Sequence, residues 1–254
     1  MKHSEFTPQL HQHICLYASF DKKIDADFSR GDGRAAINLQ VAQHEPGGGR
    51  FGGTLTFKAK THGWAEDEFT FAARDNFPYS LEPWAGTVSV WLSCDPDTDL
   101  HQDYPVDPFH ISRHPADGSF YLDLTRPNDA RYGSPRKLRF GIYGDSPAQD
   151  MYVGMQLIVV SDLKWRTADW HHVVATWRNV NTGQNNGAAA LYIDGVRHGW
   201  LAGYQHQLTW EIDTLRIGLG QRFVGKINEL LILDRALSET EIEQLYRLTG
   251  PLEL

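Results

Sequence analysis

Short β-forming runs, separated by turn-forming residues, recur along almost the whole chain. The expected strands are residues 54–59, 86–93, 109–113, 119–125, 137–143, 171–178, 188–196, 214–219 and 226–233. Gly, Pro, Asn and Asp lie between these runs, and Asp194 and Gly195 predict a tight hairpin in which both turn residues have positive φ. Many short strands with turn signals between them predict an all-β protein, either a sandwich or a barrel.

One helix is expected near the end of the sequence. Ser238 and Glu241 have the spacing of a capping box, in which the serine hydroxyl accepts a hydrogen bond from the Glu241 amide and the glutamate reaches back. Ile242, Leu245 and Tyr246 then fall on one side of the helix. The pattern predicts a short helix that packs on the strands.

Size and charge narrow the possible classes of function. Of the 254 residues 41% are apolar, which is enough for a substantial core, and the absence of a linker-like stretch favours one domain over residues 1–254. The net charge of −8 argues against nucleic acid or an anionic membrane as partner. No apolar run approaches the roughly 18 residues of a membrane span, so no membrane insertion is expected.

The cellular compartment stays open. The first residues contain no apolar segment typical of a signal peptide, and a processed protein would have the same appearance. Cys15 and Cys94 are too few for a disulfide scaffold or a four-thiolate metal site. They are either two separate buried thiols, the preferred interpretation, or one disulfide.

Several segments resemble laminin G-like domains of the concanavalin A-like lectin/glucanase superfamily. They are residues 16–21 (LYASFD), 86–92 (GTVSVWL), 170–177 (WHHVVATW), 190–195 (ALYIDG) and 223–246 (FVGKINELLILDRALSETEIEQLY). Residues 26–33 (ADFSRGDG) are similar to longer variants common in planctomycete-like bacterial exported proteins. The resemblance implies an antiparallel β-sandwich, the concanavalin A-like jelly roll, with a short C-terminal helix, and it favours an extracellular or cell-surface location. The fold hosts lectins, adhesion domains, hydrolases and lyases, so it does not define the function.

The alternation within the strands predicts a polar outer face. Side chains of a strand point alternately to opposite sides, so each apolar set leaves a complementary outer set. If these strands share one sheet, as the resemblance implies, its outer face carries His110, Tyr121, Asp123, Arg139, Tyr143, His172 and Tyr192. Aromatic rings stack on sugars, and Asp and Arg bind paired hydroxyls, so this face is predicted to bind a glycan. In the alternative interpretation, loops cover the face and its polar groups satisfy one another.

Two residues are candidates for a structural calcium site. Asp21 and Asn228 match positions that often bind calcium in similar domains, with backbone carbonyls from the glycine turn at Gly52 and Gly53 as further ligands. Similar domains usually have Asp at the position of Asn228, which weakens the site, and the alternative is that both residues only cap backbone groups. The acidic loop of residues 95–108 lacks the EF-hand pattern and is expected to be solvated.

Catalysis is not the preferred interpretation. Glu211 and Asp213 begin a glucanase-like motif, but Leu215 and Arg216 stand where its second catalytic carboxylate belongs. We therefore predict a non-catalytic carbohydrate-binding or adhesion module whose partner is a polysaccharide, an oligosaccharide or a protein. A polysaccharide lyase or glycoside hydrolase that uses the same face, or a structural protein-binding domain, remains as the alternative.

Overall fold

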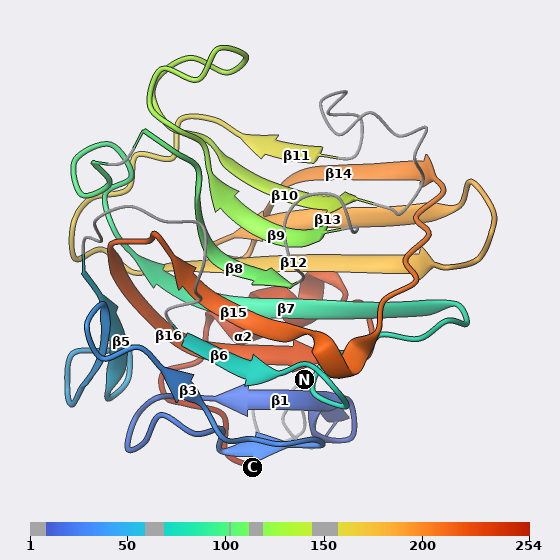
Figure 1. Cartoon of the computed structure of the whole chain (residues 1–254), viewed down its shortest axis with the longest axis horizontal. Coiled ribbons are helices and arrows are strands. Elements are labelled where there is room, and N and C mark those ends of the chain that lie inside the picture. Colours follow the sequence, from blue (N-terminus) through green and yellow to red (C-terminus); the bar gives the residue numbers. More distant parts are fainter. Residues whose placement is uncertain (1–8, 59–68, 102, 112–118, 144–156) are drawn as a thin grey trace.

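A computed structural model describes residues 9–58, 69–101, 103–111, 119–143 and 157–254, and it shows two antiparallel sheets packed face to face (Figure 1). The nine-stranded sheet runs in the order β14 (Val196–Tyr204), β13 (Gly187–Ile193), β12 (His171–Val180), β7 (Trp84–Ser93), β16 (Gly225–Leu233), β1 (Ile14–Ala18) and β2 (Phe28–Ser29), with β5 (Thr54–Phe57) on β16 and β4 (Ala42–Glu45) on β5. The seven-stranded sheet runs β11 (Leu157–Val160), β10 (Leu138–Tyr143), β9 (Ser119–Leu124), β8 (Val106–Ile111), β15 (Arg216–Gln221), β6 (Phe69–Ala72) and β3 (Ala36–Ile37). The predicted all-β sandwich is confirmed.

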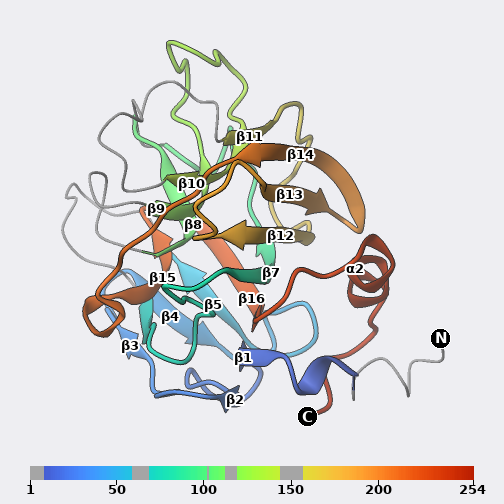
Figure 2. The same ribbon diagram turned by 90° about the vertical axis from the view of Figure 1, so that its right-hand side faces the viewer.

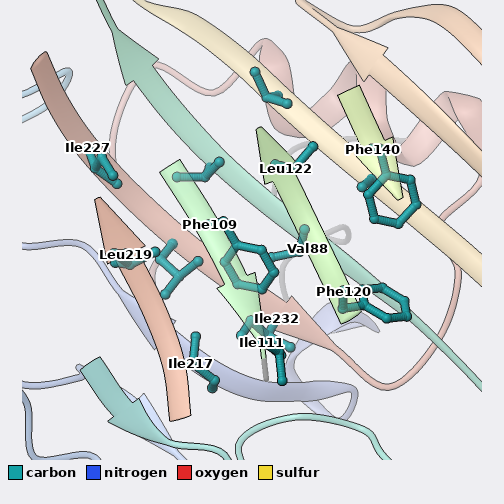
Figure 3. Packing of buried hydrophobic residues seen from close by; sticks show 14 of the residues in the cluster. Val88, Phe109, Ile111, Phe120, Leu122, Phe140, Ile217, Leu219, Ile227 and Ile232 are labelled. Atoms are coloured by element: carbon teal, nitrogen blue, oxygen red, sulfur yellow. The ribbon is translucent and has the colours of Figure 1, made fainter. Parts of the chain in front are cut away.

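The core lies between the sheets and draws on both of them (Figure 3). Val88 and Ile232 point inward from the nine-stranded sheet, and Phe109, Phe120 and Phe140 point inward from the seven-stranded sheet. All five are at most 1% exposed, and each such side chain contributes about 1.5–3 kcal/mol by leaving water. The inward set is the one that the alternation predicted, because period-2 alternation separates the two faces of every strand.

The predicted turn and helix are also confirmed. Asp194 and Gly195 both have positive φ, 52° and 80°, between β13 and β14. Helix α2 (Glu239–Tyr246) begins at a complete capping box of Ser238 and Glu241, and the side chain of its Ile242 is fully buried. Figure 2 shows α2 on the outer side of the nine-stranded sheet.

Three parts of the strand pattern differ from the prediction. Strand β8 begins at Val106 instead of 109, because a bulge between Val106 and Phe109 lets the strand continue through Pro108. Strands β2, β3, β4, β6, β11 and β14 were not among the expected runs; β14 is largely exposed and therefore has little apolar alternation. The expected strand at 214–219 is preceded by the 3₁₀ helix η1 (Ile212–Thr214).

The two cysteines are separate buried thiols, which confirms the preferred interpretation. Burial raises the pKa of Cys15 to about 12, so the thiol stays protonated and unreactive at neutral pH. Among the described residues, the helices are too short or too polar to cross a membrane.

Candidate functional site

The polar residues expected on one face are divided between two sheets. The outer face of the seven-stranded sheet carries His110 on β8, Tyr121 and Asp123 on β9, and Arg139 on β10, whereas His172 on β12 and Tyr192 on β13 belong to the nine-stranded sheet. Tyr143 ends β10, but its side chain lies outside the described part of the chain. The expectation of one shared sheet is therefore wrong. Alternation tells the inner from the outer side of a strand, but it does not tell to which sheet the strand belongs.

An ion pair joins β9 and β10 on the outer face of the seven-stranded sheet. Asp123 and Arg139 are directly opposite in the register of β9 and β10. Arg139 Nε donates to Asp123 Oδ1 at 2.7 Å, and a second guanidinium nitrogen pairs with Asp123 Oδ2. The Asp123 side chain is 4% exposed and that of Arg139 is 15% exposed. Two parallel contacts fix the plane of both groups, so the pair is preorganised.

A second carboxyl group lies next to this pair. The bulge in β8 places Asp107 and Pro108 opposite Asp123, and Asp107 also pairs in register with Gln221 of β15. Burial, and then the charge of Asp123, raise the pKa of Asp107 to about 7. Burial also raises the pKa of Asp123, although Arg139 opposes that shift. The two carboxyls thus differ in their surroundings: Asp123 is held by a guanidinium, whereas burial and the charge of Asp123 raise the pKa of Asp107.

Positive groups and tyrosines surround the two carboxyls. His110 and Arg222 both act on Asp107 electrostatically, and Arg222 directly follows β15. The guanidinium carbon of Arg222 lies 5.2 Å from the ring centre of Tyr104, which is 44% exposed. On the other side the Arg139 guanidinium carbon lies 5.5 Å from the ring centre of Tyr132. These cation–π contacts place one aromatic ring beside Arg222 and another beside Arg139.

Tyr121 lies across the neighbouring strand at the same face. A Cβ atom on Gly141 would be 2.6 Å from Tyr121 Cζ, so only glycine lets the tyrosine ring lie over β10. His110 pairs in register with Tyr121 and is almost buried. We call Asp107, His110, Tyr121, Asp123, Arg139 and Arg222 the outer-face cluster. It gathers carboxylates, guanidinium groups, an imidazole and an aromatic ring on one side of the sheet, and its members His110, Asp123 and Arg222 are each at most 8% exposed.

His172 is enclosed at a different place. Its ring, 2% exposed, stacks on Trp91 at 4.9 Å between ring centres, and Tyr246 of α2 lies beyond. Burial lowers the pKa of His172 to about 3, so the imidazole is neutral. Its Nε2 lies 2.7 Å from Ser89 Oγ, but the Asp194 carboxylate contacts the ring of His171 and only the backbone amide of His172. This serine–histidine pair is covered, and in the part of the chain that the structure describes no carboxylate hydrogen-bonds the His172 ring to orient it.

Tyr192 also faces away from the outer-face cluster. It is 5% exposed on β13 and lines a groove of about 270 Å³ beside the start of α2. Of the seven predicted residues, the structure therefore brings four together and places two on the opposite side of the sandwich.

Asp21 and Asn228 meet at the glycine turn, as the resemblance implied. A Cβ on Gly52 would lie 2.3 Å from Asp21 Oδ1, and Asn228 Nδ2 donates to Gly53 O at 2.9 Å and Ser19 O at 2.5 Å. Thus Asn228 presents an amide donor, not an oxygen, to the two carbonyls that would face a cation. Calcium ligands are oxygens, so in this arrangement Asp21 and the backbone carbonyls, not the Asn228 amide nitrogen, are the candidate ligands. Among the described residues, no cluster of three His, Cys, Asp or Glu side chains suited to a metal ion is present. Calcium binding stays a prediction.

The other acidic candidates serve local structure. Asp213 lies in η1 and forms an exposed ion pair with Arg74. In the acidic loop, Asp95 Oδ1 accepts from the Asp97 amide at 3.0 Å, and Asp99 Oδ2 accepts from the Asp95 amide at 2.7 Å. These carboxylates cap backbone donors of their own loop, which explains their spacing without a metal ion.

Comparison with known families defines the family of the chain. A profile described as "Concanavalin A-like lectin/glucanases superfamily" matches residues 52–243. The chain belongs to this superfamily. The match includes β7, both strands of the outer-face ion pair and the closing strand β16, so the resemblance stated from the sequence is confirmed.

Solved structures of this superfamily's fold resemble the chain at low sequence identity. The binding domain of Paraclostridial Mosquitocidal Protein 1 matches 94% of the chain at 15% identity, with a TM-score of 0.62. Domain 4 of AbnA, an extracellular arabinanase from Geobacillus stearothermophilus solved with arabinotriose, matches 92% at 14% identity and 0.58. The receptor-binding domain of botulinum neurotoxin type G matches 92% at 12% identity and 0.59. The chain covers 98% of the arabinanase domain, but only 52% and 51% of the two toxin domains. Among curated protein sequences, none matches.

Sequence reasoning missed Asp107 and Arg222. Asp107 was assigned to the acidic loop, because Pro108 interrupts the alternation and the expected strand began one residue later. The signal that could have identified it is Val106. Val106 and Phe109 are both buried, and the two residues between them form the bulge. Arg222 follows its strand at a positive φ of 57°, a conformation that no pattern in the sequence indicates.

Proposed function

We propose that this superfamily member is a non-catalytic carbohydrate-binding module that binds a glycan on the outer-face cluster. The observation that carries the proposal is the bidentate Asp123–Arg139 pair on a sheet face that also carries Asp107 and Tyr121. A buried and fixed ion pair leaves outward-facing lone pairs and N–H groups at set positions. Adjacent hydroxyls of a sugar ring donate and accept hydrogen bonds at such a spacing.

The aromatic residues complete the chemistry of a sugar site. Tyr121, Tyr104 and Tyr132 border the charged groups, and the apolar C–H face of a sugar ring packs against such rings. Because Arg139 and Asp123 are already ordered by each other, little side-chain entropy is lost when a ligand binds. The fold neighbours support this proposal in a general way: one is the arabinanase domain solved with arabinotriose, and others are receptor-binding domains.

A glycan array tests the proposal directly, with arabinotriose included as one probe. The variant is Tyr121→Ala, and the matched control is Tyr204→Ala, a half-buried tyrosine on β14 of the other sheet. We expect the wild-type chain and the control to bind the same glycan and Tyr121→Ala to lose that binding. Equal binding by all three proteins would show that the glycan binds at a different place on the chain. Binding of no glycan would favour the structural or protein-binding alternative.

A second candidate function is glycan cleavage at the same cluster. The observation that favours it is the pair of adjacent carboxyls with different proton affinity, Asp107 near pH 7 and Asp123 held by Arg139. Glycoside hydrolysis uses two carboxyl groups, one as acid and the other as base or nucleophile. Incubation of a bound oligosaccharide with the wild-type chain and with Asp107→Asn, followed by mass spectrometry, tests it. Shorter products from the wild-type chain alone would establish catalysis.

A further inference from the structure

A groove of about 270 Å³ lies on the other side of the sandwich, over β12, β13 and β14. Its floor consists of Thr176, Ala188, Ala190 and Ala202, and one wall is Trp200. The opposite wall is the segment from Ala236 to Glu239, which leads into α2. This volume is just below the roughly 300–1,000 Å³ of typical small-ligand pockets.

The strand register explains why the sheet is hollow here. Thr176, Ala190 and Trp200 are consecutive partners across β12, β13 and β14, so their side chains form one outward row. In the neighbouring row, two residues along each strand, Ala188 and Ala202 are partners. Alanines end at Cβ, so the floor lies low between the indole on one side and the segment before α2 on the other. The hollow follows from residue size, not from a gap in the fold.

The second wall is fixed to the sheet. Thr87 Oγ1 donates to Arg235 O at 2.7 Å and accepts from the Leu237 amide at 3.0 Å. Arg235 also pairs with Glu241 at 2.6 Å, and Glu239 pairs with Arg197 of β14 at 2.7 Å. The last ion pair joins the start of α2 to the edge strand at one end of the groove. Ligand binding would therefore require little rearrangement.

Trp200 gives the groove its chemical character. Its side chain is 64% exposed, whereas most large aromatic side chains of this chain are buried in the core. Thr176, Arg178 and Glu239 also line the groove and bring a hydroxyl, a guanidinium group and a carboxylate to it. An exposed aromatic face next to hydrogen-bonding groups suits a ring that is apolar on its face and polar at its rim. A protein interface buries about 800 Å² on each partner, far more than this groove offers.

We propose that this groove is a second carbohydrate site, which takes one sugar ring stacked on the Trp200 indole. The ring lies over Ala190 and bonds its hydroxyls to Thr176, Arg178 and Glu239. The outer-face cluster is on the opposite sheet, so the two sites face away from each other. The chain would then bind two glycan strands at once, and its apparent affinity for a glycan-coated surface would exceed that of either site alone.

NMR titration of the whole chain tests the groove separately from the outer-face cluster. The probes are arabinotriose and the methyl glycosides of glucose, galactose, mannose and N-acetylglucosamine. The chain has 8 tryptophans, and Trp200→Phe assigns the Trp200 indole resonance. We expect at least one probe to shift this resonance in the wild-type chain and in Tyr121→Ala. Filling the floor with Ala190→Leu should weaken that binding roughly tenfold, equivalent to about 1.4 kcal/mol.

The matched control for Ala190→Leu is Ala36→Leu, an exposed strand alanine on the seven-stranded sheet, which should bind the probe as the wild-type chain does. Melting temperatures of both variants verify that they fold. No shift of the Trp200 resonance with any probe overturns the proposal and leaves the outer-face cluster unaffected. A shift that Ala190→Leu does not weaken, or that Tyr121→Ala abolishes, also overturns it.

Discussion

Asp123 and Arg139 lie directly opposite each other on β9 and β10, and Asp123, which is only 3% exposed, forms a two-point ion pair with the guanidinium. Removal of one partner leaves the other charge buried without compensation. We expect Arg139→Ala to lower the free energy of unfolding by about 3–5 kcal/mol, measured by urea denaturation. Arg34, which pairs with Asp32 in full solvent, is the control, and Arg34→Ala should leave stability unchanged. An equal effect of both variants would contradict a special role for the buried pair.

Asp107 should make the protein less stable as pH rises. Because burial and Asp123 raise its pKa from 3.8 to about 7, the folded chain binds more protons at this group than the unfolded chain within that range. The free energy of unfolding therefore falls with increasing pH between these two values. Asp107→Asn removes this contribution, and urea denaturation across the range should show a smaller decline.

Glu229 also makes the protein less stable as pH rises. The contribution of Asp107 is therefore measured as the difference in stability between Asp107→Asn and the wild-type chain. Burial raises the pKa of Glu229 from 4.5 to about 8, and its Oε2 accepts from the Tyr17 hydroxyl at 2.5 Å. We expect Glu229→Gln to gain stability over the wild-type chain as pH increases from 4.5 to about 8, because over this range the folded wild-type chain keeps a proton that the unfolded chain has lost. Parallel stability curves for the two proteins would contradict this.

Helix α2 depends on its capping box. Ser238 Oγ accepts from the Glu241 amide, while Glu241 contacts both Ser238 and Arg235. Ser238→Ala should cost about 1 kcal/mol of unfolding free energy. Thr240→Ala, an exposed substitution in the same turn, is the control and should change stability by less than about 0.5 kcal/mol.

Asn228 provides a test of the calcium prediction. Asn228→Asp removes the amide donor that serves Ser19 O and Gly53 O, and it adds a carboxylate near Asp21. We expect calcium to raise the melting temperature of Asn228→Asp more than that of the wild-type chain, with chelator as the reference. A further Asp21→Asn substitution should abolish this gain. A larger calcium effect on the wild-type chain would show that Asn228 already acts as a ligand.

The sequence by itself determined the local structure and the direction of each side chain. Leu122 and Asp123 point to opposite faces of β9 because backbone geometry alternates the side chains of a strand. Ser238 begins a helix because its hydroxyl meets an amide three residues later. Such rules act over a few residues and can be read from the sequence. The family resemblance added the superfamily, since its segments occur in the same order along the chain.

Only the tertiary structure decided which outward residues meet. His110 and His172 have the same alternation pattern, yet one lies beside Asp107 and the other lies beneath α2, because the strands belong to different sheets. The bulge that places Asp107 opposite Asp123 likewise depends on pairing between strands. Period-2 alternation is identical in both sheets and carries no information about strand partners, which long-range packing selects.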